Sequence, residues 1–401
     1  MKNKSSKNDL TIDECLRFRK IEEAFLSRCR HFGYNEIKTS TIEPLYIFTA
    51  LGALNEAKLR RIYSFIDWDG WSGERVALKP DSTACVARFY GEHLFPKNPR
   101  QKLCYVENHF EWADSWDDIS ERWQCGIEDI GNKNPESDVE AIYMACDIIQ
   151  KIGFEKYYLY LSYPSITKEI NAISFDKQGG EVFINAIEKS SENHTADYLE
   201  NIKSCLHRSA YEKVQPAFEN FVSICRKLDS LECKYVIDFS AIGDLNYYTG
   251  IQFQVLSTPK RKSKSDILCS GGRYDNFIKE MWKLPEAVPA VGFALYIRNI
   301  LRHGSIMKDS SESIDQLQNI CIYVSNITKH DVKTGQMLCD KLSRLGFVSQ
   351  ITLNPVEKEK YESFGLVIEV DHERFIDGYQ VLYSQKIGKP LLKNLFGEFN
   401  A

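Results

Sequence analysis

The sequence lacks the patterns that mark several common classes of protein. Its 12 cysteines include no C-x-x-C pair, so we expect no metal site, and a disulfide framework would be unusual in a chain of 401 residues. No run approaches the roughly 20 apolar residues of a membrane span. The polar start, MKNKSSKNDL, lacks the apolar stretch of a signal peptide. We therefore expect a cytoplasmic protein with reduced thiols, no metal, no cofactor and no contact with a membrane.

An excess of positive charge is also missing. The formal net charge is −5, from 51 basic and 56 acidic residues. Nucleic-acid-binding domains are usually basic, so we expect no nucleic-acid partner. The chain is 43% hydrophobic, as globular proteins are, and its length suits two or three domains.

Patterns of helix and strand alternate along most of the chain. An apolar stripe predicts a helix over residues 11–32. Within residues 34–48 a strand is predicted to follow, and Pro44 should stop it because proline cannot donate to the ladder. The segments 101–112 and 122–131 predict an antiparallel pair of strands. A last helix is expected near residues 290–301.

Composition divides the chain into domains. Residues 1–10 are predicted to be disordered, and residues 11–301 to form the core. Within that core, residues 166–231 are interpreted as a helical insertion. A linker at 302–317 precedes a small α/β unit at 318–401.

Residues 248–256 indicate a ligand site. Period-two alternation predicts a strand with Ile251, Phe253 and Val255 on one face. The other face carries Tyr248, Gly250, Gln252 and Gln254. Polar groups on a strand face favour a pocket, because they are costly to bury unpaired.

Several segments resemble histidyl-tRNA synthetases, a family of class II aminoacyl-tRNA synthetases. Residues 18–48 resemble motif 1, and LKPDSTACVARFY with residues 103–131 resembles motif 2. GDLNYYTG and CSGGRYDNF resemble the two histidine-specific signatures, and AVGFALYIRNIL resembles motif 3. The resemblance implies an α+β fold in which helices flank an antiparallel sheet. It also implies a homodimer through the motif 1 region.

Three arginine positions of that family hold other residues. They are Glu111 in motif 2, Gly243 before the tyrosine pair, and Asn299 in motif 3. Amino-acid activation brings a carboxylate against a triphosphate, and guanidinium groups stabilise the charge that develops. Losing these groups predicts the loss of aminoacylation, and we expect no catalytic residue.

The residue types with which the family binds histidine are retained. Each alone has an ordinary structural explanation, such as Asp81 as a helix N-cap or Tyr248 as a sheet aromatic. Together, in register with a family signature, they predict a histidine-binding pocket. Its residues are Asp81, Thr83, Gln124, Glu128, Tyr248 and Tyr274.

A synthetase-like body without the arginines is most similar to the regulatory subunit of ATP phosphoribosyltransferase. That resemblance implies a role in the first step of histidine biosynthesis, feedback by L-histidine, and a hetero-octamer with a short catalytic subunit. Two alternatives stay open: a working histidyl-tRNA synthetase, and a synthetase-like scaffold for another partner.

Overall fold

The computed structural model describes residues 9–49, 59–68, 73–112, 120–172, 208–239, 248–259, 266–303, 320–326, 328–344, 349–353, 358, 366–375 and 379–384. The chain divides into two compact units, Met1–His303 and Gly304–Ala401. Several predictions lie outside the described residues: disorder over residues 1–8, the middle of the insertion at 173–207, Gly243, and the linker from residue 304 onward.

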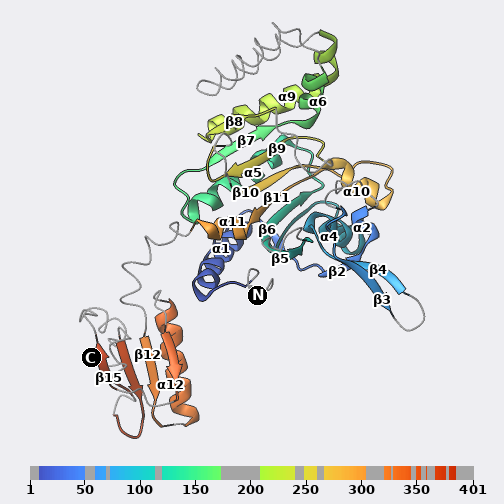
Figure 1. Cartoon of the computed structure of the whole chain (residues 1–401). Coiled ribbons are helices and arrows are strands. Elements are labelled where there is room, and N and C mark those ends of the chain that lie inside the picture. The colour runs from blue at the N-terminus through green and yellow to red at the C-terminus, as the bar shows by residue number, and fades with distance from the viewer. Residues whose placement is uncertain are drawn as a thin grey trace, which may run out of the picture. The chain divides into compact units, whose positions relative to one another are not determined.

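An eight-stranded sheet organises the first unit (Figure 1). Neighbouring strands are antiparallel except for two outer pairs, which run parallel. In spatial order the strands are β1 (Asn35–Glu36), β5 (Gln101–Phe110), β6 (Glu121–Ile130), β11 (Ala290–Tyr296), β10 (Ile267–Arg273), β9 (Gln252–Leu256), β7 (Tyr158–Ser162) and β8 (Tyr235–Ile237). The α+β prediction is confirmed, and β5 and β6 form the expected antiparallel pair.

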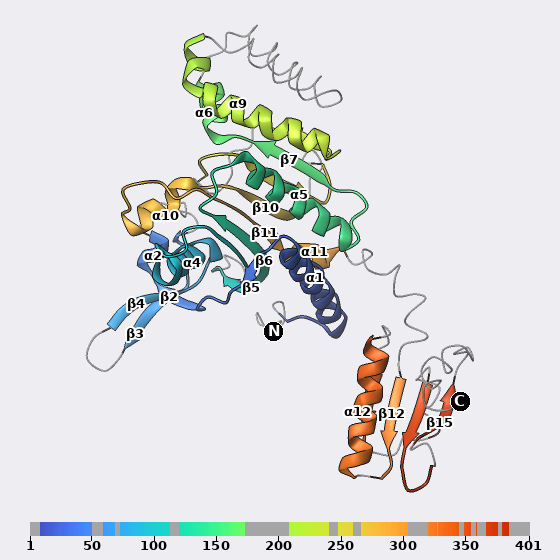
Figure 2. The same cartoon turned by 180° about the vertical axis from the view of Figure 1, so that it is seen from behind.

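Helices α1 (Ile12–His31) and α5 (Pro135–Lys151) cover one face of this sheet, as Figure 2 shows. The sequence explains the limits of α1. Thr11 and Glu14 form a capping box at its start. Beyond its end, Gly33 adopts φ +76°, a conformation that favours glycine. Phe18, Ile21, Phe25 and Cys29 form its buried stripe.

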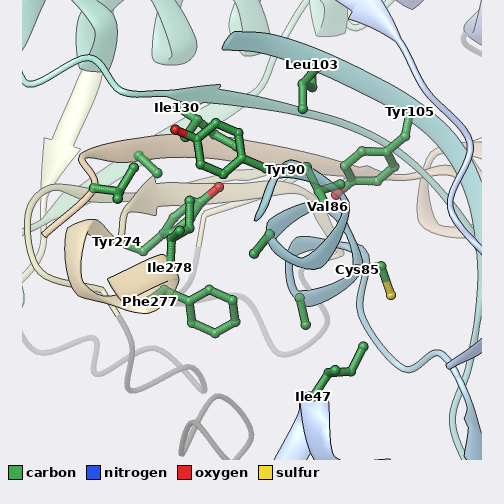
Figure 3. Close-up of a cluster of buried hydrophobic side chains, with 14 of the residues drawn as sticks. Ile47, Cys85, Val86, Tyr90, Leu103, Tyr105, Ile130, Tyr274, Phe277 and Ile278 are labelled. Atoms are coloured by element: carbon green, nitrogen blue, oxygen red, sulfur yellow. The ribbon is translucent and has the colours of Figure 1, made fainter. Parts of the chain in front are cut away.

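The opposite face packs against α4 (Ser82–Phe89) and α10 (Asp275–Trp282). Their apolar side chains meet those of the sheet in one buried cluster (Figure 3). Tyr105 and Leu103 of β5 contribute to it, as do Tyr274 and Phe277. The cluster holds both helices against the sheet beside a polar pocket.

Smaller elements complete this unit. A three-stranded sheet has the order β2 (Ile42–Pro44), β4 (Gly73–Leu78), β3 (Ser64–Trp68). The remaining helices are α2 (Tyr46–Thr49), the π-helical η2 (Tyr90–Leu94), α6 (Pro164–Ala172), α9 (Arg208–Ser230) and α11 (Ile297–Arg302). Helices α6 and α9 occupy the two described ends of the predicted insertion.

Three predictions of single elements were wrong in extent. Within residues 34–48, two short strands replace the single predicted strand; the second ends at Pro44, as predicted, and helix α2 follows. Strand β9 begins at Gln252, so Tyr248 and Gly250 precede it. Residues 290–301 begin as strand β11 and become helical only at Ile297, because the buried apolar run of seven residues pairs with both β6 and β10.

The second unit is a small α/β sheet. Its order is β13 (Ser349–Thr352), β12 (Ile320–Val324), β14 (Leu366–Val370), β15 (Tyr379–Ser384), and only β14 and β15 pair antiparallel. Helix α12 (Lys329–Arg344) packs on the buried aliphatic side chains of the sheet. In neither unit do the described residues include a helix long and apolar enough to cross a membrane.

Candidate functional site: a polar pocket on the central sheet

All six predicted histidine-binding residues line one pocket. The space among them, counted out into open solvent, is about 340 Å³. Gln124 and Glu128 come from β6, whereas Asp81 and Thr83 stand at the start of α4. Tyr274 immediately precedes α10, and Tyr248 comes from the segment before β9. Strands and helices that are far apart in sequence therefore bring these side chains together, while their role in binding stays a prediction.

Glycines form part of the floor of the pocket. Glu128, Gly292 and Gly272 lie side by side on β6, β11 and β10. A Cβ atom at Gly292 would lie 1.9 Å from Oε2 of Glu128, so this glycine makes room for the carboxylate. A Cβ atom at Gly272 would lie 2.8 Å from the ring of Tyr248. Gly272, of the Gly-Gly pair in SGGRYD, thus serves close packing.

Gly126 plays a different part from the one its sequence position suggests. It shares the pocket face with Gln124 and Glu128, where period two predicts room for a ligand. The ring of Tyr105, directly opposite on β5, occupies that room instead. A Cβ atom at Gly126 would lie 2.2 Å from Cζ of Tyr105.

Glu128 is a buried acid of the pocket with a strongly perturbed pKa. Its side chain is buried, with 2% of the residue exposed. The hydroxyl of Thr83 donates to Oε1 at 3.0 Å, and that of Tyr274 donates to Oε2. Burial raises the pKa of Glu128 to about 8, because these hydrogen bonds only partly offset it and the nearby charge of Asp81 repels. An unliganded Glu128 is therefore largely protonated at neutral pH.

The start of α4 supplies two pocket residues. Asp81 is the N-cap, as predicted, and accepts from the backbone N–H of Ala84 at 3.3 Å. Thr83, two positions later, reaches Glu128. The capping role explains why an aspartate stands at position 81, and the same turn directs the Thr83 side chain toward β6.

A buried arginine anchors the two tyrosines. Nε of Arg273 donates to Asp138 of α5 at 2.8 Å, and its NH2 group donates to Ser137. The carbonyl of Arg273 accepts from the backbone N–H of Thr249 at 2.8 Å. Tyr248 precedes Thr249 in the chain, and Tyr274 follows Arg273. The hydrogen bond between Thr249 and Arg273 therefore holds the two tyrosines near each other.

Sequence reasoning missed other residues that line the pocket. Among them are Ser270 on β10 and Tyr296 on β11, whose hydroxyl oxygens are 2.6 Å apart. Burial raises the pKa of Tyr296 to about 12. The signal was present, because Ser270 shares its strand face with Gly272, and Tyr296 shares its own with Gly292. Because residues 290–301 were predicted to be helical, Tyr296 was not expected on a strand face.

Two of the three lost arginine positions lie in described residues. Glu111, after β5, forms ion pairs with Arg122 at 2.8 Å and Arg61 at 3.4 Å. Asn299 of α11 donates to the backbone carbonyl of Ile267 at 2.8 Å. Neither residue lines the pocket.

A second buried polar network lies beside the pocket on β5. Nζ of Lys79 donates to Oε2 of Glu107 at 2.7 Å, and Ser82 donates to the same oxygen. Although burial alone raises the pKa of Glu107, these hydrogen bonds outweigh it and lower the pKa overall. Burial, with the charge of Lys79, lowers the pKa of His109 to about 3, so this imidazole is neutral. Neither here nor in the pocket do the described residues contain a group of His, Cys, Asp and Glu able to hold a metal.

Comparisons with known proteins identify relatives of this chain. A profile of the histidyl-tRNA synthetase family matches residues 7–208 and 193–300. Two proteins from Dehalococcoides mccartyi named ATP phosphoribosyltransferase regulatory subunit are similar. One is 29% identical over 88% of each chain, and the other is 31% identical over 78% of each chain. A histidine–tRNA ligase from Prochlorococcus marinus is 28% identical over 75% of this chain and 72% of the ligase.

Solved structures show the same fold. An ATP phosphoribosyltransferase regulatory subunit/histidyl-tRNA synthetase from Bacillus halodurans has a TM-score of 0.60, at 19% identity, over 88% of this chain and 94% of the other. The apo histidyl-tRNA synthetase of S. aureus has a TM-score of 0.61, at 19% identity, over 98% of each chain. Taken with the family match and the 31% identical relative, they show that this chain belongs to the ATP phosphoribosyltransferase regulatory subunits, within the histidyl-tRNA synthetase family.

Proposed function

We propose that this chain serves an ATP phosphoribosyltransferase as its non-catalytic regulatory subunit and senses L-histidine in the pocket. A short catalytic subunit carries out the reaction, and the two chains assemble as a hetero-octamer. Homodimers of this chain form through the motif 1 region, residues 18–48. One observation supports the proposal above others: six residues of histidine-binding type line one pocket, while Glu111 and Asn299 are engaged outside it.

The pocket suits the polar groups of histidine. The carboxylates of Glu128 and Asp81 complement an α-ammonium group, and charge-assisted hydrogen bonds are the stronger kind. The hydroxyls of Tyr248 and Tyr274 can bond an imidazole nitrogen. Histidine regulates the complex only if it binds the inhibited state more tightly than the active one.

The alternative of a working synthetase is disfavoured by the contacts of Glu111. The arginine expected there clamps phosphate, whereas Glu111 reverses the charge and forms ion pairs with Arg61 and Arg122. Losing one such clamp typically costs about 3–4 kcal/mol of transition-state stabilisation. We expect no histidine-dependent ATP–pyrophosphate exchange, and exchange above background would restore the synthetase alternative.

Calorimetry tests the sensor directly. The purified full chain is titrated with L-histidine, alone and with the catalytic subunit. Glu128→Gln is expected to weaken binding at least tenfold, since it removes a charge-assisted contact of about 1.5–3 kcal/mol. Asp129→Asn is the matched control, because Asp129 is the next residue of β6 and does not line the pocket.

A second experiment tests the assembly. The chain is co-expressed with a short catalytic subunit, and the complex is weighed by light scattering. Histidine should inhibit the complex, and Glu128→Gln should shift the inhibition to higher concentrations. Absence of a complex, or of histidine binding at millimolar concentration with the subunit present, would leave the scaffold alternative in place.

A further inference from the structure

We infer that Arg122 binds the carboxylate of the histidine ligand and so gives the pocket its preference for an amino acid over a simple amine. The inference rests on the proposed function and adds a residue to the same site. An amino acid is a zwitterion, so a pocket that takes it out of water has to pair a cation with its carboxylate. The described lining residues include the acids Asp81 and Glu128 but no lysine or arginine. A side chain beside the lining therefore has to supply the positive charge.

Arg122 stands on the pocket face of β6, next to the lining. By period two it shares that face with Gln124 and Glu128, and Gln124 is the nearer of the two along the strand. The Cα atoms of Arg122 and Gln124 lie about 7 Å apart along an extended strand, a distance that a long side chain can span. Gln124 pairs directly with Tyr296 of β11, so Arg122 is the diagonal neighbour of that tyrosine. The guanidinium is thus placed to reach the end of the pocket formed by Gln124 and Tyr296.

Charges of both signs act on Tyr296. Burial raises the pKa of its hydroxyl to about 12; the negative charge of Asp81 adds to this rise, and the positive charge of Arg122 opposes it. Tyr296 therefore lies within the electrostatic reach of an acid and of a cation. A ligand carboxylate that turns away from Asp81 and toward Tyr296 moves closer to the charge of Arg122. This arrangement orients a zwitterion along the pocket.

Arg122 has hydrogen-bond donors available, unlike two other cations near the pocket. Lys79 and Arg273 are buried, and each forms an ion pair with a buried carboxylate. The side chain of Arg122 is 43% exposed, and among the described residues its five N–H donors have one acceptor, the carboxylate of Glu111. The remaining N–H groups of the planar guanidinium can bind a carboxylate.

Glu111 holds Arg122 in place without cancelling the positive charge of this region. The carboxylate of Glu111 faces two guanidinium groups, those of Arg122 at 2.8 Å and of Arg61 at 3.4 Å. Two cations share one anion, so an excess of positive charge remains among these three side chains. A side chain that is already ordered loses less conformational entropy when a ligand binds. The contact with Glu111 thus prepares Arg122 for a ligand carboxylate.

Calorimetry on the full chain compares L-histidine with histamine, which has the same ring and amine but no carboxylate. Arg122→Gln should weaken histidine binding about tenfold, the low end for losing a charge-assisted hydrogen bond, because the site is half-exposed. Histamine binding, measured by displacement of histidine where it is weak, should stay as in the wild type. Arg122→Lys should recover part of the histidine affinity, because lysine keeps the charge but not the planar guanidinium.

Arg61→Gln is the matched control, because Arg61 pairs with the same Glu111 but precedes β3 and does not line the pocket. It should leave the affinities for both ligands unchanged, and circular dichroism of all three variants verifies folding. If Arg122→Gln left histidine binding unchanged, or weakened both ligands equally, the inference would be overturned while the proposed function stood. Failure of the wild type to bind histidine would overturn both.

Discussion

Two buried glutamates on adjacent strands should respond in opposite ways to the same substitution. Glu107 of β5 has a lysine partner, whereas Glu128 of β6 has only hydroxyl partners among the described residues. We expect Glu107→Gln to destabilise the protein and Glu128→Gln to stabilise it when no ligand is present. The two variants are matched in size, burial and chemistry, so each serves as the control for the other.

The magnitude for Glu128 follows from its pKa of about 8, against 4.5 for an ordinary glutamate. The folded state holds this proton more tightly than the unfolded chain does. The associated stability is therefore complete below pH 4.5 and is lost as pH rises through 8. Each pKa unit corresponds to about 1.4 kcal/mol. The advantage of glutamine over glutamate should grow by about 4 kcal/mol between roughly pH 5 and roughly pH 8.5.

The contribution of Glu107 to stability depends on pH in the opposite direction. Its pKa lies below the ordinary value, so its stability is present at neutral pH and is lost as pH falls through the lowered pKa. Removing it strands the buried ammonium of Lys79, a kind of loss that typically costs about 3–5 kcal/mol.

Urea unfolding followed by tryptophan fluorescence measures both effects. All 6 tryptophans precede residue 304, so the signal reports on the first unit alone. The experiment is run without histidine, at several pH values, on wild type and both variants. If Glu128→Gln destabilised the protein at about pH 8.5 as Glu107→Gln does, Glu128 would have a cationic partner in the free protein, and the reasoning would be wrong.

Three further outcomes are expected. Gly292→Ala should lower the free energy of unfolding by about 1–3 kcal/mol and weaken ligand binding, because its Cβ atom would lie 1.9 Å from the Glu128 carboxylate. Gly33→Ala is the control: Gly33 has φ +76° and no atom within 4 Å of an added Cβ. This variant should lower the free energy of unfolding in urea by about 1 kcal/mol and leave calorimetric binding unchanged. Light scattering at micromolar concentration should find a dimer, and a monomer would contradict the motif 1 prediction. Glu111→Arg should fail to restore ATP–pyrophosphate exchange and should lower stability, since it adds a third cation beside Arg61 and Arg122.

The sequence predicted the pocket better than it predicted the strands that build it. Asp81 and Thr83 belong to a local N-cap signal, and Gln124 and Glu128 share a strand face by period two, so short-range patterns place each pair. Their meeting with Tyr274 required the long-range order of the sheet, which was available through the family resemblance and not through any local pattern.

Other features were beyond a pattern-based prediction. Gly126 looked like space for a ligand, but the residue directly opposite on β5 is Tyr105, and register decides what fills the gap. Asp138 lies in the first turn of α5, where an acidic residue suits the helix dipole, yet it is the buried partner of Arg273 from a distant strand. The strand pairing joins residues in two different strands, and the ion pair joins residues 135 positions apart, so a local window of sequence contains neither contact.

The two ends of the β5–β6 hairpin differ in the charges that surround their acidic residues. Near Glu128 the lining keeps acidic and neutral polar groups, and it leaves a buried carboxylate without a cation among the described residues. Near Glu111 the protein supplies both charges itself, because Glu111 forms ion pairs with Arg61 and Arg122. A buried carboxyl group without a cation is costly to ionise and is therefore held protonated, whereas a carboxylate paired with arginines stays charged. A ligand with an ammonium group could pair with Glu128 and offset the cost of ionising it. This difference between the two ends favours a binding site for a small amine over a site for a triphosphate.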